Sequence, residues 1–415
     1  MSKTIYVYET FSSQKSEIMG YLYIDFSRGS EHHSFEFDNN WLKSHSCKFT
    51  LDPELYFTQG RQYPAGKPTF GIFSDASPDR WGRVLMERKE RFTADKESRK
   101  PKKLNSGDYL LGVYDESRMG ALRFKSETSG DFLSYDKETS VPPWTALRTL
   151  EEASRNFENE ETTLQEKWLN QLIRPGSSLG GARPKATVKD PDGELWIAKF
   201  PSRKDDYNIG AWEKTANDLA VLCGLNVPQT RLENFSKLGS TFLVKRFDRN
   251  ETKRIHFASA MTMLGKTDGA SSDDGTSYLD IVSFIKSNGA DPKKDLLELW
   301  KRIVFNMAIT NSDDHLRNHG FLLRKDGWHL SPIYDINPVP YGDTLALNID
   351  NISNEISLEL AVESAHYYCI LKKDAVSIAA DIINTIKNNW EKTALSNGLT
   401  HAAIENMRPA FNLCK

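Results

Sequence analysis

The chain has 415 residues, of which 39% are apolar and 27% are charged, and its formal net charge at pH 7 is −3. This length exceeds what one ordinary domain needs, so it predicts two or three domains. The near balance of charges gives no overall electrostatic reason for direct binding to nucleic acid or to a membrane surface. No run of about 18 apolar residues is present, so no membrane-spanning helix is expected.

The four cysteines, Cys47, Cys223, Cys369 and Cys414, are far apart and form no CxxC pair. Scattered thiols of this kind are typical of a reducing compartment. The first residues, MSKTIYV, lack the apolar stretch of a secretory signal. We therefore expect a cytoplasmic protein.

The first part of the chain alternates between apolar and polar residues, as half-buried strands do. Three strands are expected, at residues 5–8, 20–26 and 34–37. A helix is predicted after Pro78, with Ser77 as the residue that signals its start. Together with residues 108–114 and 121–124, these segments indicate a small α+β domain over residues 1–130.

A polar stretch with two prolines, residues 126–148, is typical of a linker. The elements expected beyond it are a charged helix, two strands around a turn, a helix ended by a glycine, and a further strand, at residues 149–173, 186–189, 195–200, 207–223 and 241–247. This order predicts a β-rich lobe over residues 145–250.

Helical periodicity dominates from residue 251 to the end of the chain. Apolar residues recur at the spacing of one helix face between Leu296 and Ala308. Residues 374–395 are predicted to form another helix. A helical lobe over residues 251–415 is therefore expected to follow the β-rich lobe.

The segment Asn311-Ser-Asp-Asp-His-Leu-Arg-Asn-His-Gly320 follows the first of these helices, so its polar side chains lie on a loop at the end of a rigid element. Asp313 and Asn318 have the D-x₄-N spacing that relates the base and a metal ligand in protein-kinase catalytic loops. After a predicted strand–turn–strand unit, Asp335 takes the position of a second metal-binding aspartate. Phosphoryl transfer needs such groups, because one carboxylate orients the attacking hydroxyl while another and an amide oxygen hold Mg²⁺.

Other interpretations of this loop stay open. Asp314 could be the base, since only the spacing favours Asp313, and Asp313 could simply cap a helix. His315 and His319 are four residues apart, as some zinc ligands are, but no third ligand is near and the segment is predicted as a loop. We therefore interpret His319 as a hydrogen-bonded structural residue.

A glycine-rich segment lies upstream, Ser177-Ser-Leu-Gly-Gly-Ala-Arg-Pro-Lys185, whose backbone N–H groups could approach phosphate oxygens. It lacks the Walker A pattern. Lys199 follows within an apolar strand, where burial of an unpaired ammonium group is costly, and Glu213 lies on the next predicted helix. A strand lysine paired with a helix glutamate is the arrangement of kinase N-lobes, although Lys199 could instead reach solvent from an edge strand.

In this order the motifs resemble the HipA family of bacterial toxin kinases. The segments that carry the resemblance are Ser178-Leu-Gly-Gly-Ala-Arg-Pro-Lys185, Ile197-Ala-Lys-Phe-Pro201, Val244-Lys-Arg-Phe-Asp-Arg249, Asn311-Ser-Asp-Asp-His-Leu-Arg-Asn318 and Leu330-Ser-Pro-Ile-Tyr-Asp335. The segment Phe73-Ser-Asp-Ala-Ser-Pro-Asp-Arg-Trp-Gly82 is more loosely similar to the family's N-terminal subdomain. The resemblance implies an α+β, protein-kinase-like two-lobe fold, with a β-rich N-lobe, a helical C-lobe and an extra N-terminal α+β subdomain.

The resemblance also implies roles for single residues. Asp313 would be the catalytic aspartate, Asn318 and Asp335 the Mg²⁺ ligands, and Ser178 the site of an inactivating autophosphorylation, with Ser177 as a competing acceptor. The ATP-binding residues would be Gly180, Gly181, Ala182, Arg183, Pro184, Lys185, Lys199, Lys245, Arg246, Phe247, His315, Arg317, Asn318, Tyr334 and Asp335. Arg183-Pro184 stands where the family usually has Gln-Glu, which leaves the contacts of this loop open.

The same resemblance implies ATP and Mg²⁺ as cofactors and a small HipB-like helix-turn-helix antitoxin as a partner, with operator DNA bound only through that antitoxin. The chain is thus predicted to be a serine/threonine-protein kinase that phosphorylates a host protein, with an aminoacyl-tRNA synthetase as the substrate known from the family.

Two alternatives would keep the same fold. A small-molecule kinase of the aminoglycoside-phosphotransferase kind would use the same nucleotide site, and residues 178–185 disfavour it because they match the HipA motif. A non-catalytic corepressor module would keep the fold without chemistry. The joint presence of Lys199, Asp313, Asn318 and Asp335 disfavours that second alternative.

Overall fold

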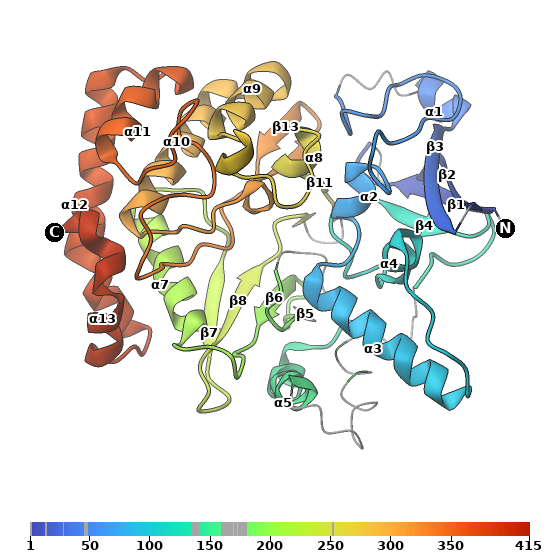
Figure 1. Ribbon diagram of the computed structural model, residues 1–415, viewed down its shortest axis with the longest axis horizontal. Coiled ribbons are helices and arrows are strands. Elements are labelled where there is room, and N and C mark those ends of the chain that lie inside the picture. Colours follow the sequence, from blue (N-terminus) through green and yellow to red (C-terminus); the bar gives the residue numbers. More distant parts are fainter. Residues whose placement is uncertain are drawn as a thin grey trace. The chain divides into compact units, whose positions relative to one another are not determined.

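A computed structural model describes residues 2–12, 15–27, 29–44, 49–134, 141–158, 169, 172, 181–250 and 253–415. The chain divides into two compact units, and Figure 1 labels most of their helices and strands. The first comprises Met1–Arg203, Asp248–Ala258 and Leu322–Lys325, and the second comprises Lys204–Phe247, Ser259–Phe321 and Asp326–Lys415. The domains predicted at residues 1–130, 145–250 and 251–415 stay predictions.

The first unit begins with an antiparallel sheet of strand order β3-β2-β1-β4. Its strands are β1 (Lys3–Glu9), β2 (Glu17–Ser27), β3 (Ser30–Phe37) and β4 (Arg123–Lys125). Leu22 pairs with Ile5 on one side and with Phe35 on the other, and all three side chains are buried. Alternate residues share a face of a sheet, so the period-two pattern that predicted the first three strands is confirmed.

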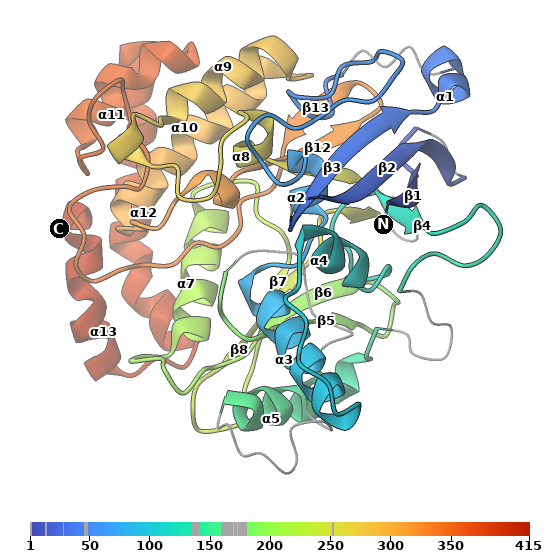
Figure 2. The same cartoon turned by 45° about the vertical axis from the view of Figure 1, so that its right-hand side comes forward.

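The helices of the first unit are α1 (Asn39–Ser44), α2 (Gly71–Asp75), α3 (Arg80–Lys96), α4 (Ser106–Gly112) and α5 (Leu147–Glu158), the last preceded by the 3₁₀ turn η1 (Trp144–Ala146). The prediction that Ser77 signals the start of α3 is wrong. The Ser77 hydroxyl donates to the Phe73 carbonyl and so closes α2, whereas Asp79 caps α3 by accepting from the Gly82 amide. Figure 2 shows α3 with α4 beside it.

A β-hairpin in the first unit carries the end of the glycine-rich segment. It consists of β5 (Lys185–Lys189) and β6 (Leu195–Lys199), which pair antiparallel on either side of Gly193. α5 packs against β5. The helix predicted at residues 149–173 corresponds to α5 as far as Glu158, and most of its remainder lies outside the described residues. The short strands of this part of the chain are β9 (Arg249–Asn250), β10 (Lys253–Arg254) and β11 (His256–Ser259).

The second unit opens with α7 (Ile209–Leu222), which packs on the hairpin of β7 (Thr230–Glu233) and β8 (Thr241–Lys245). The helix is capped by Asn208, whose side chain accepts from the Ala211 amide. Gly224, with φ of 67°, follows its end, as glycine does at many helix C-termini. This helix and the strand β8 both appear where the sequence predicted them.

The rest of the second unit is mainly helical. Its helices are α8 (Ala260–Met263), α9 (Tyr278–Asn288), α10 (Pro292–Ala308), α11 (Leu358–Ser364), α12 (Lys372–Ser396) and α13 (His401–Met407), with 3₁₀ turns η2 (Ser272–Asp274), η3 (Leu316–Asn318), η4 (Ala365–Tyr368) and η5 (Arg408–Cys414). The predicted apolar face of α10 is buried and packs against α9, α11 and α12. In Figure 1, α12 runs alongside both α7 and α10.

After α10 the chain forms a loop and then the strands β12 (Gly320–Arg324) and β13 (Gly327–Leu330), as the sequence predicted. Within the described ranges, no helix is both long enough and apolar enough to cross a membrane.

Candidate active site

The loop of residues 311–318 leaves the C-terminal end of α10 through Thr310, which has a φ of 52°. Few residues other than glycine adopt this left-handed conformation. The Thr310 hydroxyl donates to the Ala410 carbonyl at 2.8 Å, and the Val339 amide donates to the Thr310 carbonyl at 3.2 Å. The start of the loop is therefore held from two sides by segments far away in the sequence.

Asp314 is buried at the centre of a hydrogen-bond network. Its Oδ2 accepts from the Tyr278 hydroxyl at 2.6 Å and from the Asn306 amide at 2.8 Å, and it lies 3.0 Å from His319 Nε2. Burial by itself would raise the pKa of Asp314, but His319 and the Tyr278 hydroxyl outweigh burial and hold this pKa below its usual range. The prediction that His319 is a hydrogen-bonded structural histidine is confirmed.

Asp313 has a different environment from its neighbour, because it is exposed. The protein on one side of its carboxyl group removes part of the hydration, which raises the pKa of Asp313. The nearby Asp335 raises it further, and His315 and Arg317 offset the rise only in part. Two carboxylates that repel each other in this way form a favourable place for a cation.

Asn318 is bound back to the residue that precedes Asp314. Its amide nitrogen donates to the Asp313 carbonyl at 2.8 Å, and its side chain is buried. Because the nitrogen is used in this way, the amide oxygen is the group that remains to ligate a cation. Asp335, the other predicted ligand, has a φ of 58°, a left-handed conformation that costs free energy in residues other than glycine.

Two aromatic residues predicted to line the nucleotide lie together in the second unit. The ring centroids of Phe247 and Tyr334 are 5.5 Å apart, and the Tyr334 hydroxyl donates to the Arg317 carbonyl at 2.7 Å. Lys245 ends β8, and Arg246 follows it as a buried residue. Within the second unit, Tyr334 thus connects residues 245–247, which were predicted to bind ATP, to the predicted catalytic loop.

The other predicted site residues belong to the first unit. Gly181 has a φ of 84°, which favours glycine, and Lys185 begins β5. The Lys185 ammonium nitrogen lies 2.7 Å from the Asp79 carboxylate and 3.2 Å from the Gly181 carbonyl oxygen. Ala182, Arg183 and Pro184 stand between these two ends of the loop, while Gly180, Ser178 and Ser177 lie outside the described residues. Contact of this loop with ATP stays a prediction.

Lys199 is the last residue of β6, and the residue is only 9% exposed. Glu213, its predicted partner, is buried on α7 of the second unit. The two residues belong to different units, and their pairing stays a prediction.

Sequence reasoning missed Tyr278, Asn306 and Asp79. The first two support Asp314 from two different helices, and no periodic pattern marks such a partner. Asp79 could have been found, because an aspartate directly before a helix is a frequent N-cap.

The predicted metal ligands are of the chemical kind that Mg²⁺ prefers in proteins. Within the described ranges, no three His, Cys, Asp or Glu side chains are grouped so that they could hold a metal by themselves. Mg²⁺ needs no such group, because it is usually held by one or two carboxylates together with substrate phosphates and water. The Asp335 carboxylate and the Asn318 amide oxygen are hard oxygen ligands of the required kind.

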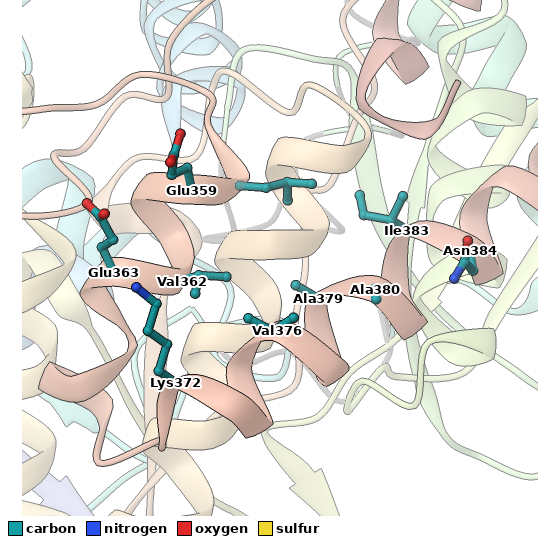
Figure 3. A pocket seen from close by; sticks show the side chains of 10 residues that line it. Glu359, Val362, Glu363, Lys372, Val376, Ala379, Ala380, Ile383 and Asn384 are labelled. Carbon is teal, nitrogen blue, oxygen red and sulfur yellow. The ribbon is translucent and has the colours of Figure 1, made fainter.

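A separate hollow of about 470 Å³ lies between α11 and α12 (Figure 3). Val362, Val376 and Ile383 line it together with the acidic side chains of Glu359 and Glu363. No residue predicted for the nucleotide site lines it, so we assign this hollow no part in the chemistry.

Comparison with solved structures shows the fold of the protein. The fold resembles that of a chain in the Shewanella oneidensis MR-1 complex of HipA, HipB and operator DNA, with a TM-score of 0.71 and 17% sequence identity. This match covers 99% of the present chain and 96% of the other. The predicted α+β, protein-kinase-like fold class is thereby confirmed.

The family follows from the sequence itself. The family model described as the HipA-like C-terminal domain matches residues 177–390, which is just over half of the chain. The chain therefore belongs to the family of HipA-like proteins, and the resemblance noted from its motifs is confirmed.

Sequence relatives agree with this assignment. The serine/threonine-protein kinase toxin HipA of Shewanella oneidensis is 24% identical over 281 residues, which cover 59% of this chain and 63% of the relative. A Sinorhizobium fredii protein named "Putative kinase Y4mE" is 30% identical over 191 residues, which cover 40% of this chain and 43% of the relative. The chain thus spans about half of the length of the curated relatives that it matches.

Proposed function

We propose that this chain is a Mg²⁺- and ATP-dependent serine/threonine-protein kinase of the HipA type. The observation that carries the proposal is the contrast between two adjacent aspartates. The Asp314 carboxylate lies within hydrogen-bond distance of three buried polar side chains. Asp313, in contrast, is exposed, lies near Asp335 and has a raised pKa. A raised pKa favours a general base, because a carboxylate of ordinary acidity is a poor proton acceptor near neutral pH.

In the proposed reaction, Asp313 orients the hydroxyl group of the substrate and accepts its proton as the hydroxyl oxygen attacks the γ-phosphorus of ATP. The bond from the γ-phosphorus to the β–γ bridging oxygen breaks, and ADP leaves. Asn318 and Asp335 would hold Mg²⁺, which would neutralise the charge of the β- and γ-phosphates. Lys199 is proposed to contact these phosphates, and residues 245–247 to lie beside the adenine.

The partners are proposed from the family. The similar solved structure is a complex of HipA, HipB and operator DNA. We therefore propose that this chain binds a HipB-like antitoxin and reaches DNA only through it. We further propose a host protein as the substrate, of which an aminoacyl-tRNA synthetase is the first candidate to test.

Autophosphorylation of Ser178 is proposed as the inactivating step. A phosphate on this serine would add roughly −1.5 to −2 charges directly before the loop proposed to hold ATP phosphates. Repulsion should expel either the loop or the nucleotide. Mass spectrometry of active protein and of the Asp313→Asn variant tests this step. Phosphate on Ser177 instead of Ser178, or phosphorylated protein that still turns over at the full rate, would contradict it.

The function itself is tested by transfer of labelled phosphate from ATP into a lysate of the host cells. The wild type should label protein on serine or threonine, and Asp313→Asn should not. Asp326→Asn is the matched control, because Asp326 is an exposed aspartate of the same unit, 68% exposed at its side chain. Label found only in small molecules would favour the small-molecule kinase, and no transfer by the wild type would favour the corepressor module.

A further inference from the structure

The N-terminal end of α3 is tied to the predicted nucleotide-binding loop within the first unit. Lys185 Nζ lies 2.7 Å from Asp79 Oδ2, and the two side chains are only 1% and 3% exposed. Trp81, in the first turn of α3, donates from its amide to the Gly181 carbonyl at 3.4 Å and from its indole Nε1 to the Lys185 carbonyl at 3.1 Å. Both ends of the loop, at Gly181 and at Lys185, are therefore held by one helix start.

The pairing of residues in the hairpin shows why the contact between Asp79 and Lys185 matters electrostatically. Lys185 on β5 pairs directly with Lys199 on β6, so both lysine side chains leave the same face of the hairpin. Directly opposed like charges destabilise a strand pair, and the effect grows when the charges are buried, as both lysines are here. The Asp79 carboxylate supplies the counter-charge at Lys185.

We propose that Asp79 is a positioning residue of the nucleotide-binding loop, which acts through Lys185. It holds the Lys185 ammonium group against the Gly181 carbonyl and so keeps the loop backbone in one shape, while Lys199 is the lysine that meets the ATP phosphates. Lys185 then has a positioning role in place of the direct ATP contact that was predicted for it. The inference rests on the proposed kinase function.

The two oxygens of Asp79 have separate tasks, which allows a clean test. Oδ1 accepts from the Gly82 amide and caps α3, and Oδ2 pairs with Lys185. Asp79→Asn retains a good N-cap residue and removes only the charge. The variant leaves a buried ammonium group without its counter-charge, which can destabilise the fold. The double variant Asp79→Asn/Lys185→Met removes both charges and keeps the volume, so it should fold.

Four quantities would be measured for each variant: the Kd of Mg²⁺-ATP by calorimetry, kcat, KM for ATP, and the hydrogen-exchange rates of the backbone amides of residues 181–189 other than Pro184. We expect Asp79→Asn and the double variant to raise Kd and KM about tenfold or more, because misplaced binding groups lose much of their effect. We expect kcat to fall less than KM rises, since the loop binds the phosphates before and during transfer. Exchange at residues 181–189 should become faster.

Asp108→Asn is the matched control, because Asp108 also lies at a helix start and pairs with a lysine, Lys102, at 2.7 Å, but it lies on α4 and its side chain is 28% exposed. It should leave all four quantities unchanged. If the double variant folds with the melting temperature of the wild type and binds ATP equally well, the inference is overturned while the kinase proposal stands. If the wild type binds no nucleotide, the kinase proposal is wrong, and so is the proposed role of Asp79 in nucleotide binding. The exchange rates then still decide whether Asp79 orders the loop.

Discussion

His319 Nε2 and Asp314 Oδ2 lie 3.0 Å apart, and their side chains are only 2% and 4% exposed. The pair joins the two ends of a short segment that also contains Asn318, and Tyr278 and Asn306 donate to the same carboxylate oxygen. A buried carboxylate with three polar partners is costly to move, because each lost partner leaves an uncompensated group behind. The pair thus fixes the shape of the loop and leaves Asp313 available at its surface.

Asp313→Asn should reduce phosphate transfer by at least about 100-fold, the usual effect of removing a general base. Its stability at pH 7 should be equal to or above that of the wild type. The pKa of Asp313 is higher in the folded protein than in the unfolded chain. Ionisation of this carboxyl group therefore disfavours the folded state at pH values above its pKa in the folded protein. The difference should vanish at acidic pH, where the carboxyl is protonated in both states. Kinase assays measure the loss of phosphate transfer, and thermal melts at pH 7 and at acidic pH measure the difference in stability. Full activity of Asp313→Asn, with an inactive Asp314→Asn, would show that Asp314 is the base.

Asp314→Asn should destabilise the fold by about 3 kcal/mol at pH 7, since it breaks a buried charge network. The pKa of Asp314 in the folded state lies below its usual value of 3.8. Ionised Asp314 therefore contributes to the stability of the fold at pH values above the pKa that this residue has in the unfolded chain. This contribution is lost as the pH falls through the pKa that Asp314 has in the folded protein. Urea unfolding measures the free energy of unfolding of the variant and of the wild type at pH 7 and at acidic pH. The difference between the two proteins should become smaller at acidic pH. Asp381→Asn, at an exposed aspartate of α12, should unfold with the same free energy as the wild type at both pH values.

ATP turnover should require Mg²⁺ or Mn²⁺, because the proposed ligands Asn318 and Asp335 are hard oxygen donors. Treatment with EDTA should abolish transfer, and added Mg²⁺ should restore it while Zn²⁺ does not. Metal analysis of the purified protein provides the check. Stoichiometric zinc that is lost together with activity would contradict this assignment.

Tyr334→Phe should destabilise the protein by about 1 kcal/mol, since it removes the hydrogen bond to the Arg317 carbonyl but keeps the ring against Phe247. Tyr334→Ala should weaken ATP binding more than Tyr334→Phe does, because it also removes the ring. Denaturant unfolding and ATP titration separate the two effects. Tyr341→Phe serves as the control, since Tyr341 is 81% exposed. Equal ATP affinity of all three variants would exclude Tyr334 from the nucleotide site.

The local elements that carry the site could be predicted from the sequence. The buried face of α10, the strands β5 and β6, and the loop with D-x₄-N spacing all follow from periodicity or from residue types at fixed distances along the chain. Such signals are readable because neighbours in a helix or a strand are also near neighbours in sequence.

The choice between Asp313 and Asp314, and the partner of Lys185, required the tertiary structure. Adjacent aspartates look alike in a sequence, and they differ here because Tyr278, Asn306 and His319 converge on one of them. Asp79 lies far before Lys185 in the chain, yet the two side chains are 2.7 Å apart. Hydrogen-bond and charge partners of a buried group come from whichever segments pack around it, and only folding decides which segments those are.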